Sequence, residues 1–247
     1  MNVLITGASR GIGRAAARLA GVRGWNVGVN YASNAEAAEA TVRDVQQAGG
    51  RAVAIQADVT QEAQVVHMFQ QMEQEFGSIH GVVVNAGIVA PSSTLADMSV
   101  DRLRRVFDTN VLGAYICARE AARRLPAASS QDRSTSIVIL SSAAARLGSP
   151  NEYVDYAGSK GAMDTLTTGL SKELGPSFVR VNAVRPGIID TDIHASAGDP
   201  ERLQRLGNQT PLRRAGSAEE TAEAIVWLLS PASSYVTGTH IDVTGGR

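Results

Sequence analysis

Short runs rich in β-branched and apolar residues alternate with longer helical patterns along all 247 residues of this chain. The expected strands are residues 3–6, 26–31, 51–56, 81–84, 136–140, 180–184 and 240–243. The expected helices are residues 12–22, 35–48, 62–76, 100–125, 153–174 and 218–229. Strands that are apolar on both faces and alternate with helices form parallel sheets covered on both sides. With right-handed crossovers, the pattern predicts one α/β domain over residues 1–247, a doubly wound parallel sheet of about seven strands flanked by helices.

A glycine-rich turn, TGASRGIG at residues 6–13, follows the first expected strand and opens the first helix. Glycines let the backbone approach a pyrophosphate, which binds the free N–H groups of a helix N-terminus. The spacing G-x-x-x-G-x-G differs from the common G-x-G-x-x-G fingerprint, but its strand–turn–helix context predicts a dinucleotide site on a Rossmann-type sheet. The turn residues expected to bind the cofactor are Gly7, Ser9, Arg10, Gly11, Ile12 and Gly13.

The same turn also contains G-x-S-x-G at residues 7–11, the nucleophile-elbow pattern of α/β hydrolases. His194 or His240 would then have to complete a catalytic triad. An elbow placed directly after the first strand has no upstream strand and loop to supply the second oxyanion donor. Nucleotide binding is therefore favoured, and a hydrolase is the alternative.

The second expected strand ends in VNYAS, residues 29–33, without a carboxylate. NAD enzymes place an acid at this point to bind the ribose hydroxyls, and a carboxylate there would repel a 2′-phosphate. Arg10 is placed to pair with that phosphate, and Asn30, Tyr31 and Ser33 complete the expected contact surface. The sequence thus predicts NADP(H) over NAD(H); an ordinary solvated turn arginine is the alternative for Arg10.

Composition excludes several classes of function. The 23 basic and 24 acidic residues are interspersed, with a net charge of -1, so neither nucleic acid nor an anionic membrane is an expected partner. No apolar run reaches the length of a membrane span, and the N-terminus lacks a signal-peptide pattern. The single cysteine, Cys117, fits a reducing compartment, and we expect a cytoplasmic protein. The four histidines share no metal-ligand spacing, so no metal site is expected.

Tyr156 and Lys160 stand four residues apart in an expected helix and therefore share one face. A cation beside a phenol in a partly dry cleft lowers the phenol pKa from about 10. The pair alone is weak evidence, because a solvated helix face also explains it. Ser141 and Ser142 end the fifth expected strand, and alternation lets only one of them face a cleft. Tyr153 has no lysine four residues on.

Taken together, these motifs resemble the short-chain dehydrogenase/reductase family over essentially the whole chain. Besides the glycine turn, the matching positions in order are Asp58-Val59, VNAG at residues 84–87, Asn110, Ser142, Tyr156 with Lys160, Pro186-Gly187 with Thr191, and Gly245-Gly246. Val84 stands where the family usually has the first Asn of its strand-four motif. The resemblance implies a seven-stranded sheet ordered 3-2-1-4-5-6-7 and commonly a homotetramer.

The resemblance also implies roles for individual residues. Tyr156 would donate a proton to a carbonyl oxygen that Ser142, chosen over Ser141 by the family register, holds by a hydrogen bond. Lys160 would lower the Tyr156 pKa and bind the nicotinamide ribose, and Asn110 would hold a water linked to Lys160. Further implied cofactor contacts are Asp58, Val59, Asn85, Ala86, Gly87, Tyr156, Lys160, Pro186, Gly187, Ile189 and Thr191.

The expected function is an NADP(H)-dependent oxidoreductase acting on a carbonyl or secondary alcohol, similar to 3-oxoacyl-[acyl-carrier-protein] reductases. A sugar or other small-alcohol dehydrogenase and a non-catalytic NADP(H)-binding regulator are the alternatives. Residues 188–211 are punctuated by Gly, Asp and Pro and predict a substrate lid. An acyl carrier protein would need a basic patch, for which the candidates, or else simple solvated helix charges, are Arg102, Arg104, Arg105, Arg123 and Arg124.

Overall fold

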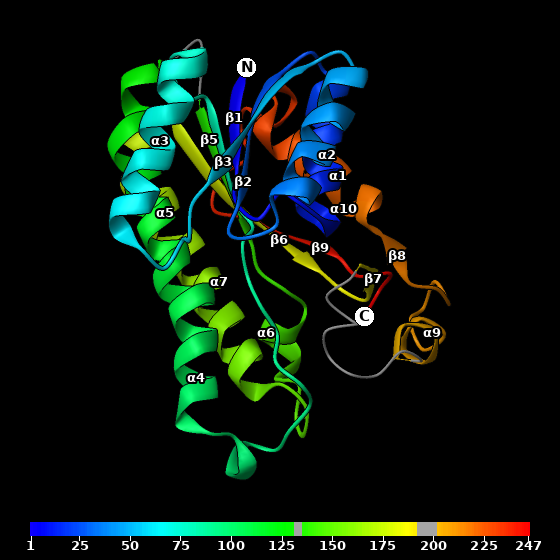
Figure 1. The fold of residues 1–247 in the computed structure, drawn as a ribbon. Coiled ribbons are helices and arrows are strands. Elements are labelled where there is room, and N and C mark those ends of the chain that lie inside the picture. Colours follow the sequence, from blue (N-terminus) through cyan, green and yellow to red (C-terminus); the bar gives the residue numbers. More distant parts are fainter. Residues whose placement is uncertain (131–134, 192–201) are drawn as a thin grey trace.

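Seven strands pair in parallel in the order β3-β2-β1-β4-β5-β6-β9 (Figure 1). Their bounds in the computed structural model are β1 Asn2–Ile5, β2 Asn26–Tyr31, β3 Arg51–Gln56, β4 Gly81–Val84, β5 Thr135–Leu140, β6 Val179–Pro186 and β9 His240–Val243. The structure describes residues 1–130, 135–191 and 202–247. Counted along the chain, this is the order 3-2-1-4-5-6-7 that the family resemblance implies, and the expected single α/β domain is confirmed.

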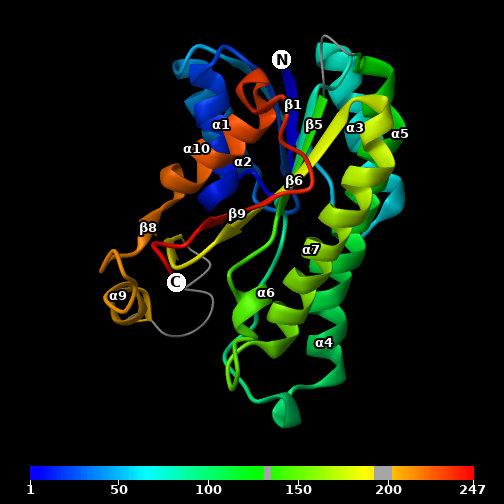
Figure 2. The same ribbon diagram turned by 180° about the vertical axis from the view of Figure 1, so that it is seen from behind.

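Helices cover both faces of the sheet, as Figures 1 and 2 show. One layer holds α1 (Gly11–Val22), α2 (Ala35–Gln47) and α10 (Ala218–Leu229), and the other holds α3 (Glu62–Phe76), α4 (Val100–Phe107), α5 (Ala114–Arg124) and α7 (Val154–Leu174). Shorter elements lie near the ends of β5 and β6: α6 (Ala144–Leu147), α9 (Arg202–Gly207), and the two-residue strands β7 (Ile189–Asp190) and β8 (Gly216–Ser217).

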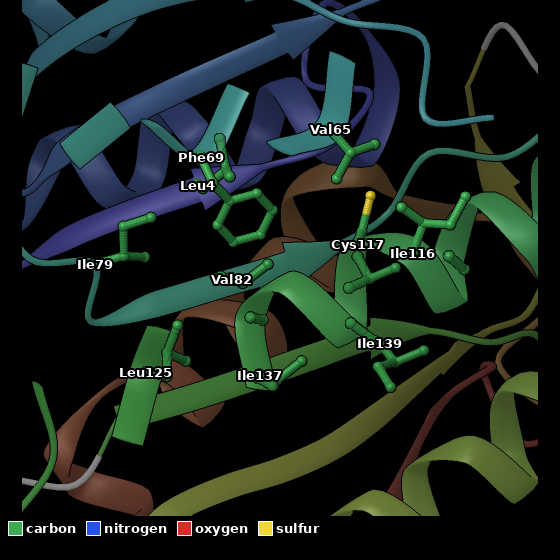
Figure 3. Packing of buried hydrophobic residues seen from close by; sticks show 14 of the residues in the cluster. Leu4, Val65, Phe69, Ile79, Val82, Ile116, Cys117, Leu125, Ile137 and Ile139 are labelled. Atoms are coloured by element: carbon green, nitrogen blue, oxygen red, sulfur yellow. The ribbon is translucent and has the colours of Figure 1, made fainter. Parts of the chain in front are cut away.

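Each central strand contributes side chains to two separate cores. Val3 and Ile5 pack under α1, α2 and α10, whereas Leu4 packs under α3, α5 and α7. This alternation follows from the two-residue period of a strand and explains why the strands are apolar throughout. Figure 3 shows the second core, where Phe69 and Cys117 lie among aliphatic side chains. Burial raises the pKa of the Cys117 thiol to about 12, so this cysteine is an unreactive core residue.

The expected continuous helix over residues 100–125 is broken. α4 ends at Phe107, a π-helical turn spans Asp108–Gly113, and α5 begins at Ala114. Asn110 lies in this turn, and its side chain bonds both backbone groups of Ile88. π-Helical turns of this kind are often found at functional sites.

The described parts of the chain contain no helix long and apolar enough to cross a membrane. The same residues contain no cluster of three or more His, Cys, Asp or Glu side chains that could hold a metal ion. Residues 192–201 of the expected lid, including His194, lie outside the described residues.

Candidate active site

A cleft of about 1110 Å³ lies at the carboxyl ends of the strands. This is where ligands bind in doubly wound sheets. The cleft is lined by every predicted cofactor residue: Gly7, Ser9, Arg10, Gly11, Ile12, Gly13, Asn30, Tyr31, Ser33, Asp58, Val59, Asn85, Ala86, Gly87, Tyr156, Lys160, Pro186, Gly187, Ile189 and Thr191. Ser142 also lines it. Asn110 does not; it lies behind the wall and is 1% exposed.

The glycine turn has the geometry that close approach of a phosphate requires. Gly7 and Gly11 have φ values of +62° and +53°, which side-chain-bearing residues rarely adopt. A Cβ on Gly13 would lie 2.5 Å from the carbonyl oxygen of Gly7. No side chain caps the N-terminus of α1, so its first N–H groups remain available to an anion in the cleft. The turn therefore fits the pyrophosphate of a dinucleotide.

Asn30 lines the cleft, but its side chain bonds to backbone groups and not to a site for the phosphate. Its Oδ1 accepts from the Gly7 N–H (3.1 Å), and its Nδ2 donates to the carbonyl oxygens of Ala57 (3.0 Å) and Ile55 (3.3 Å). Because the side chain is 1% exposed and bonded at both ends, it braces the glycine turn against β3. The phosphate role expected for Asn30 is corrected accordingly.

A second brace joins the glycine turn to the end of β4. The Thr6 hydroxyl accepts from the N–H groups of Asn85 (2.9 Å) and Ala86 (3.0 Å). The Asn85 Nδ2 donates to the carbonyl oxygens of Thr6 (2.8 Å) and Gly7 (3.1 Å). The NAG segment thus holds one wall of the cleft in place through its backbone and its amide.

Tyr156, Ser142 and Lys160 lie together in the wall of the cleft. Burial raises the pKa of the Tyr156 phenol, and a hydrogen bond with Ser142 opposes this rise. The Lys160 Nζ lies 5.7 Å from the centre of the Tyr156 ring and donates to the Leu140 carbonyl oxygen at 2.7 Å. Lys160 is 5% exposed, and burial lowers its pKa to about 8. The negative charge of Asp164 raises this pKa, but by less than burial lowers it. The expected lowering of the Tyr156 pKa by Lys160 is therefore not present in this structure.

Asn110 and Lys160 converge at Gly87. A Cβ at Gly87 would lie 3.2 Å from the Asn110 Oδ1, a tight contact, and 3.6 Å from the Lys160 Nζ, an ordinary one. The Asn110 Nδ2 also donates to the Ser159 hydroxyl (3.1 Å), which in turn donates to the Tyr156 carbonyl oxygen (2.7 Å). The sequence analysis did not include Ser159 in the site, although Ser159 directly precedes Lys160 in the chain.

The structure also separates the two adjacent serines. Ser141 is 2% exposed, and its hydroxyl donates to the Lys160 carbonyl oxygen at 3.1 Å. The Ser142 hydroxyl accepts from the Ala144 N–H at 3.1 Å and lies in the cleft wall. Both serines line the cleft, but the Ser141 hydroxyl is already bonded to the backbone of α7, so Ser142 remains the predicted active-site serine.

Arginines around the cleft differ in their partners. Arg10 is exposed at the cleft, and no ion pair among the described residues involves it. Of the candidate basic patch, Arg102 pairs with buried Asp155, and Arg123 and Arg124 both pair with Glu120. Arg105 is exposed and lines the cleft.

Comparisons with known proteins show the family of this chain. A family model described as Enoyl-(Acyl carrier protein) reductase matches residues 7–247. The uncharacterized oxidoreductase YgfF of Escherichia coli (strain K12) is 50% identical over 244 residues, 99% of this chain and 98% of that protein. A short-chain type dehydrogenase/reductase from Mycobacterium marinum is similar in structure, with a TM-score of 0.91 and 36% identity over 99% of this chain and 94% of that one.

The structure of 3-ketoacyl-(acyl-carrier-protein) reductase from Brucella melitensis complexed with NADH is also similar. Its TM-score is 0.92 and its identity 27%, and the match covers 99% of this chain and 97% of the other. This chain belongs to the short-chain dehydrogenase/reductase family, whose members are oxidoreductases that bind a nicotinamide cofactor.

Proposed function

We propose that this protein transfers a hydride between NADP(H) and a carbonyl or secondary alcohol. The observation that carries the proposal is the meeting of Tyr156, Ser142 and Lys160 in the same cleft as the uncapped glycine turn. When bound, the nicotinamide supplies or accepts the hydride. The protein then has to position the carbonyl, polarise it and move one proton.

Tyr156 is the proposed proton donor to the carbonyl oxygen during reduction. The phenol is protonated at neutral pH and so has a proton to donate; burial raises its pKa and weakens it as an acid, and the hydrogen bond with Ser142 acts in the opposite direction. The Ser142 hydroxyl would hydrogen-bond the same oxygen and stabilise the negative charge that develops on it. Lys160 would bind the nicotinamide ribose hydroxyls, and Asn110 would hold a water that returns protons toward Lys160.

The preference for NADP(H) rests on two features of the adenosine end. Arg10 lines the cleft without an ion-pair partner among the described residues, and it borders the uncapped N-terminus of α1. The end of β2 offers Tyr31 and Ser33 to the cleft and no carboxylate. A guanidinium beside free N–H groups favours a 2′-phosphate, and a missing acid removes the repulsion.

A 3-oxoacyl thioester is the substrate we favour. The matching family model and the Brucella melitensis structure both carry acyl carrier protein in their descriptions. Residues 188–211 would act as the substrate lid, since Ile188 and Leu206 from its described parts line the cleft. A sugar or other small alcohol is the alternative substrate.

The assembly we propose is a homotetramer. Large apolar side chains are exposed along one stretch of the chain around the π-helical turn: Phe107 is 43%, Leu112 51% and Tyr115 40% exposed. Exposed apolar residues grouped in this way favour subunit contacts. Sedimentation analysis of the purified protein tests the number of subunits.

The function is tested by following oxidation of NADPH and NADH against a carbonyl panel led by an acetoacetyl thioester. Turnover of the thioester with NADPH supports the proposal. Turnover of other ketones but not of the thioester would show that the substrate is not a 3-oxoacyl thioester. Arg10→Gln should raise the KM for NADPH about 10- to 100-fold, because a charge-assisted hydrogen bond contributes about 1.5–3 kcal/mol. The KM for NADH should hardly change. Arg14→Gln is the matched control, since Arg14 pairs with Asp44 and does not line the cleft.

A further inference from the structure

The helix that carries Tyr156 begins without a conventional cap. α7 starts at Val154, and the preceding Tyr153 makes no side-chain capping bond. The first-turn N–H groups of a helix lack intrahelical partners, and uncapped first turns fray. Tyr156 lies in this first turn, so its position depends on whatever else holds the turn.

Asp155 supplies that support. Its Oδ1 accepts from the Tyr156 N–H at 2.9 Å, satisfying one of the free first-turn donors. The same carboxylate accepts two hydrogen bonds from Arg102 of α4, at 2.8 Å from Nε and 3.2 Å from Nη2. The side chains of Asp155 and Arg102 are 1% and 11% exposed, so water has little access to the pair.

Arg102 also reaches a third segment. Its Nη1 donates to the carbonyl oxygen of Pro91, in the chain between β4 and α4. The same segment bonds the residues before α7 directly, because the Ser93 N–H donates to the Glu152 carbonyl oxygen at 3.0 Å. Ile88, Val89 and Glu152 line the cleft. Arg102 therefore joins α4, one rim of the cleft and the first turn of α7.

We propose that the ion pair of Arg102 and Asp155, the Arg102–Asp155 clamp, positions Tyr156 by ordering the first turn of α7 against the cleft rim. Both are positioning residues, because they act on the reaction through Tyr156. The proposal deepens the proposed function and rests on the role assigned there to Tyr156. Burial raises the pKa of the Asp155 carboxyl, but hydrogen bonds from Arg102 and the Tyr156 N–H outweigh it and hold that pKa below its ordinary value. The clamp is thus ionised at neutral pH.

Two variants loosen the clamp in different ways. Asp155→Asn keeps the shape of the side chain but removes its charge and one of its acceptor oxygens. Arg102→Lys keeps the charge, but an ammonium lacks the planar fork that spans both carboxylate oxygens and the Pro91 carbonyl. Glu73→Gln is the matched control, because Glu73 pairs with Arg124 between α3 and α5 and does not line the cleft.

The first measurement is kinetic. Both clamp variants should lose about 10- to 100-fold in kcat, the scale expected when a reacting group shifts by about 1 Å. The dissociation constant for NADPH should stay within about threefold of wild type, since the ordering acts on Tyr156 and not on the glycine turn. The double variant should be no worse than the poorer single variant, because both changes break the same contact. Unchanged kcat, or losses that multiply in the double variant, would overturn the clamp.

The second measurement is hydrogen–deuterium exchange of the cofactor-free protein, which needs no turnover. The backbone amides of residues 154–158 should exchange faster in Asp155→Asn and Arg102→Lys than in wild type, and Glu73→Gln should leave them unchanged. Equal protection in all four proteins would refute the clamp even if activity falls. If wild type turns over no carbonyl but the exchange difference appears, the proposed function fails and the clamp stands.

Discussion

The brace formed by Asn30 makes a sharp prediction about what the end of β2 contributes. Asn30→Ala removes the acceptor of the Gly7 N–H and the donors to the carbonyl oxygens of Ala57 and Ile55. A net hydrogen bond contributes about 1 kcal/mol, and leaving a buried donor unpaired costs about 1–3 kcal/mol. The free energy of unfolding should therefore fall by about 2–4 kcal/mol. Urea denaturation followed by circular dichroism measures it.

The second part of this prediction concerns the cofactor. Without the brace, Gly7 is free to leave the conformation that brings the turn close to a phosphate, and binding has to pay for ordering it. We expect NADPH affinity to weaken about tenfold, equivalent to about 1.4 kcal/mol. NADH affinity should weaken by the same factor, because the brace supports the shared pyrophosphate and not the 2′-phosphate.

Asn182→Ala is the matched control for Asn30→Ala. Asn182 is 0% exposed and braces two backbone segments, through the Val236 carbonyl oxygen at 2.8 Å and the Thr239 N–H at 3.1 Å. It does not line the cleft. Both variants should lose stability, but Asn182→Ala should keep NADPH affinity. Equal affinities in the two variants, or a selective loss of NADPH binding over NADH in Asn30→Ala, would refute the reasoning.

Two further predictions concern α7. Ser159→Ala removes the link from Asn110 to the Tyr156 carbonyl oxygen. It should lower kcat about tenfold, within the range for losing a positioning contact. Ser171→Ala is the control: it breaks a similar bond, to the Thr168 carbonyl oxygen at 3.0 Å, and should leave kcat unchanged. The folded-state pKa of Lys160 is about 8 against 10.5 for the ordinary side chain, so between these pH values the unfolded chain binds more protons. Wild type should then gain about 3 kcal/mol of stability relative to Lys160→Met as pH rises from 8 to 10.5, as measured by urea denaturation. If the stability difference between wild type and Lys160→Met stayed constant from pH 8 to 10.5, the lowered pKa of Lys160 would be contradicted.

The sheet was predictable because its strands are buried on both faces. Continuous apolar runs alternating with helices leave few topologies, and the expected ends of most elements lie within one residue of those observed. The π-helical turn at Asn110 was not predicted; Asn110 within it bonds Ile88, 22 residues away, and local periodicity does not report such a contact. Local periodicity over residues 100–125 contains no sign of it.

The candidate site, like the fold, has parts that the sequence predicts and parts that it does not. The motif residues could be proposed from the sequence because phosphate binding and proton transfer need particular residue types at particular spacings. Asn30 was assigned to the wrong partner, since its amide is a plausible phosphate donor until the structure shows both ends bonded to backbone. The Arg102–Asp155 clamp joins residues 53 positions apart, and no spacing rule links an arginine of one helix to an aspartate of another.

The most direct test of the proposed mechanism is Tyr156→Phe, which removes the phenol oxygen and keeps the ring. NADPH oxidation with a carbonyl that wild type reduces should fall by about 10²- to 10⁴-fold, the usual contribution of a general acid. NADPH affinity and the free energy of unfolding should stay close to wild type, because the variant loses only the proton donor. Full turnover in Tyr156→Phe would show that Tyr156 does not supply the proton.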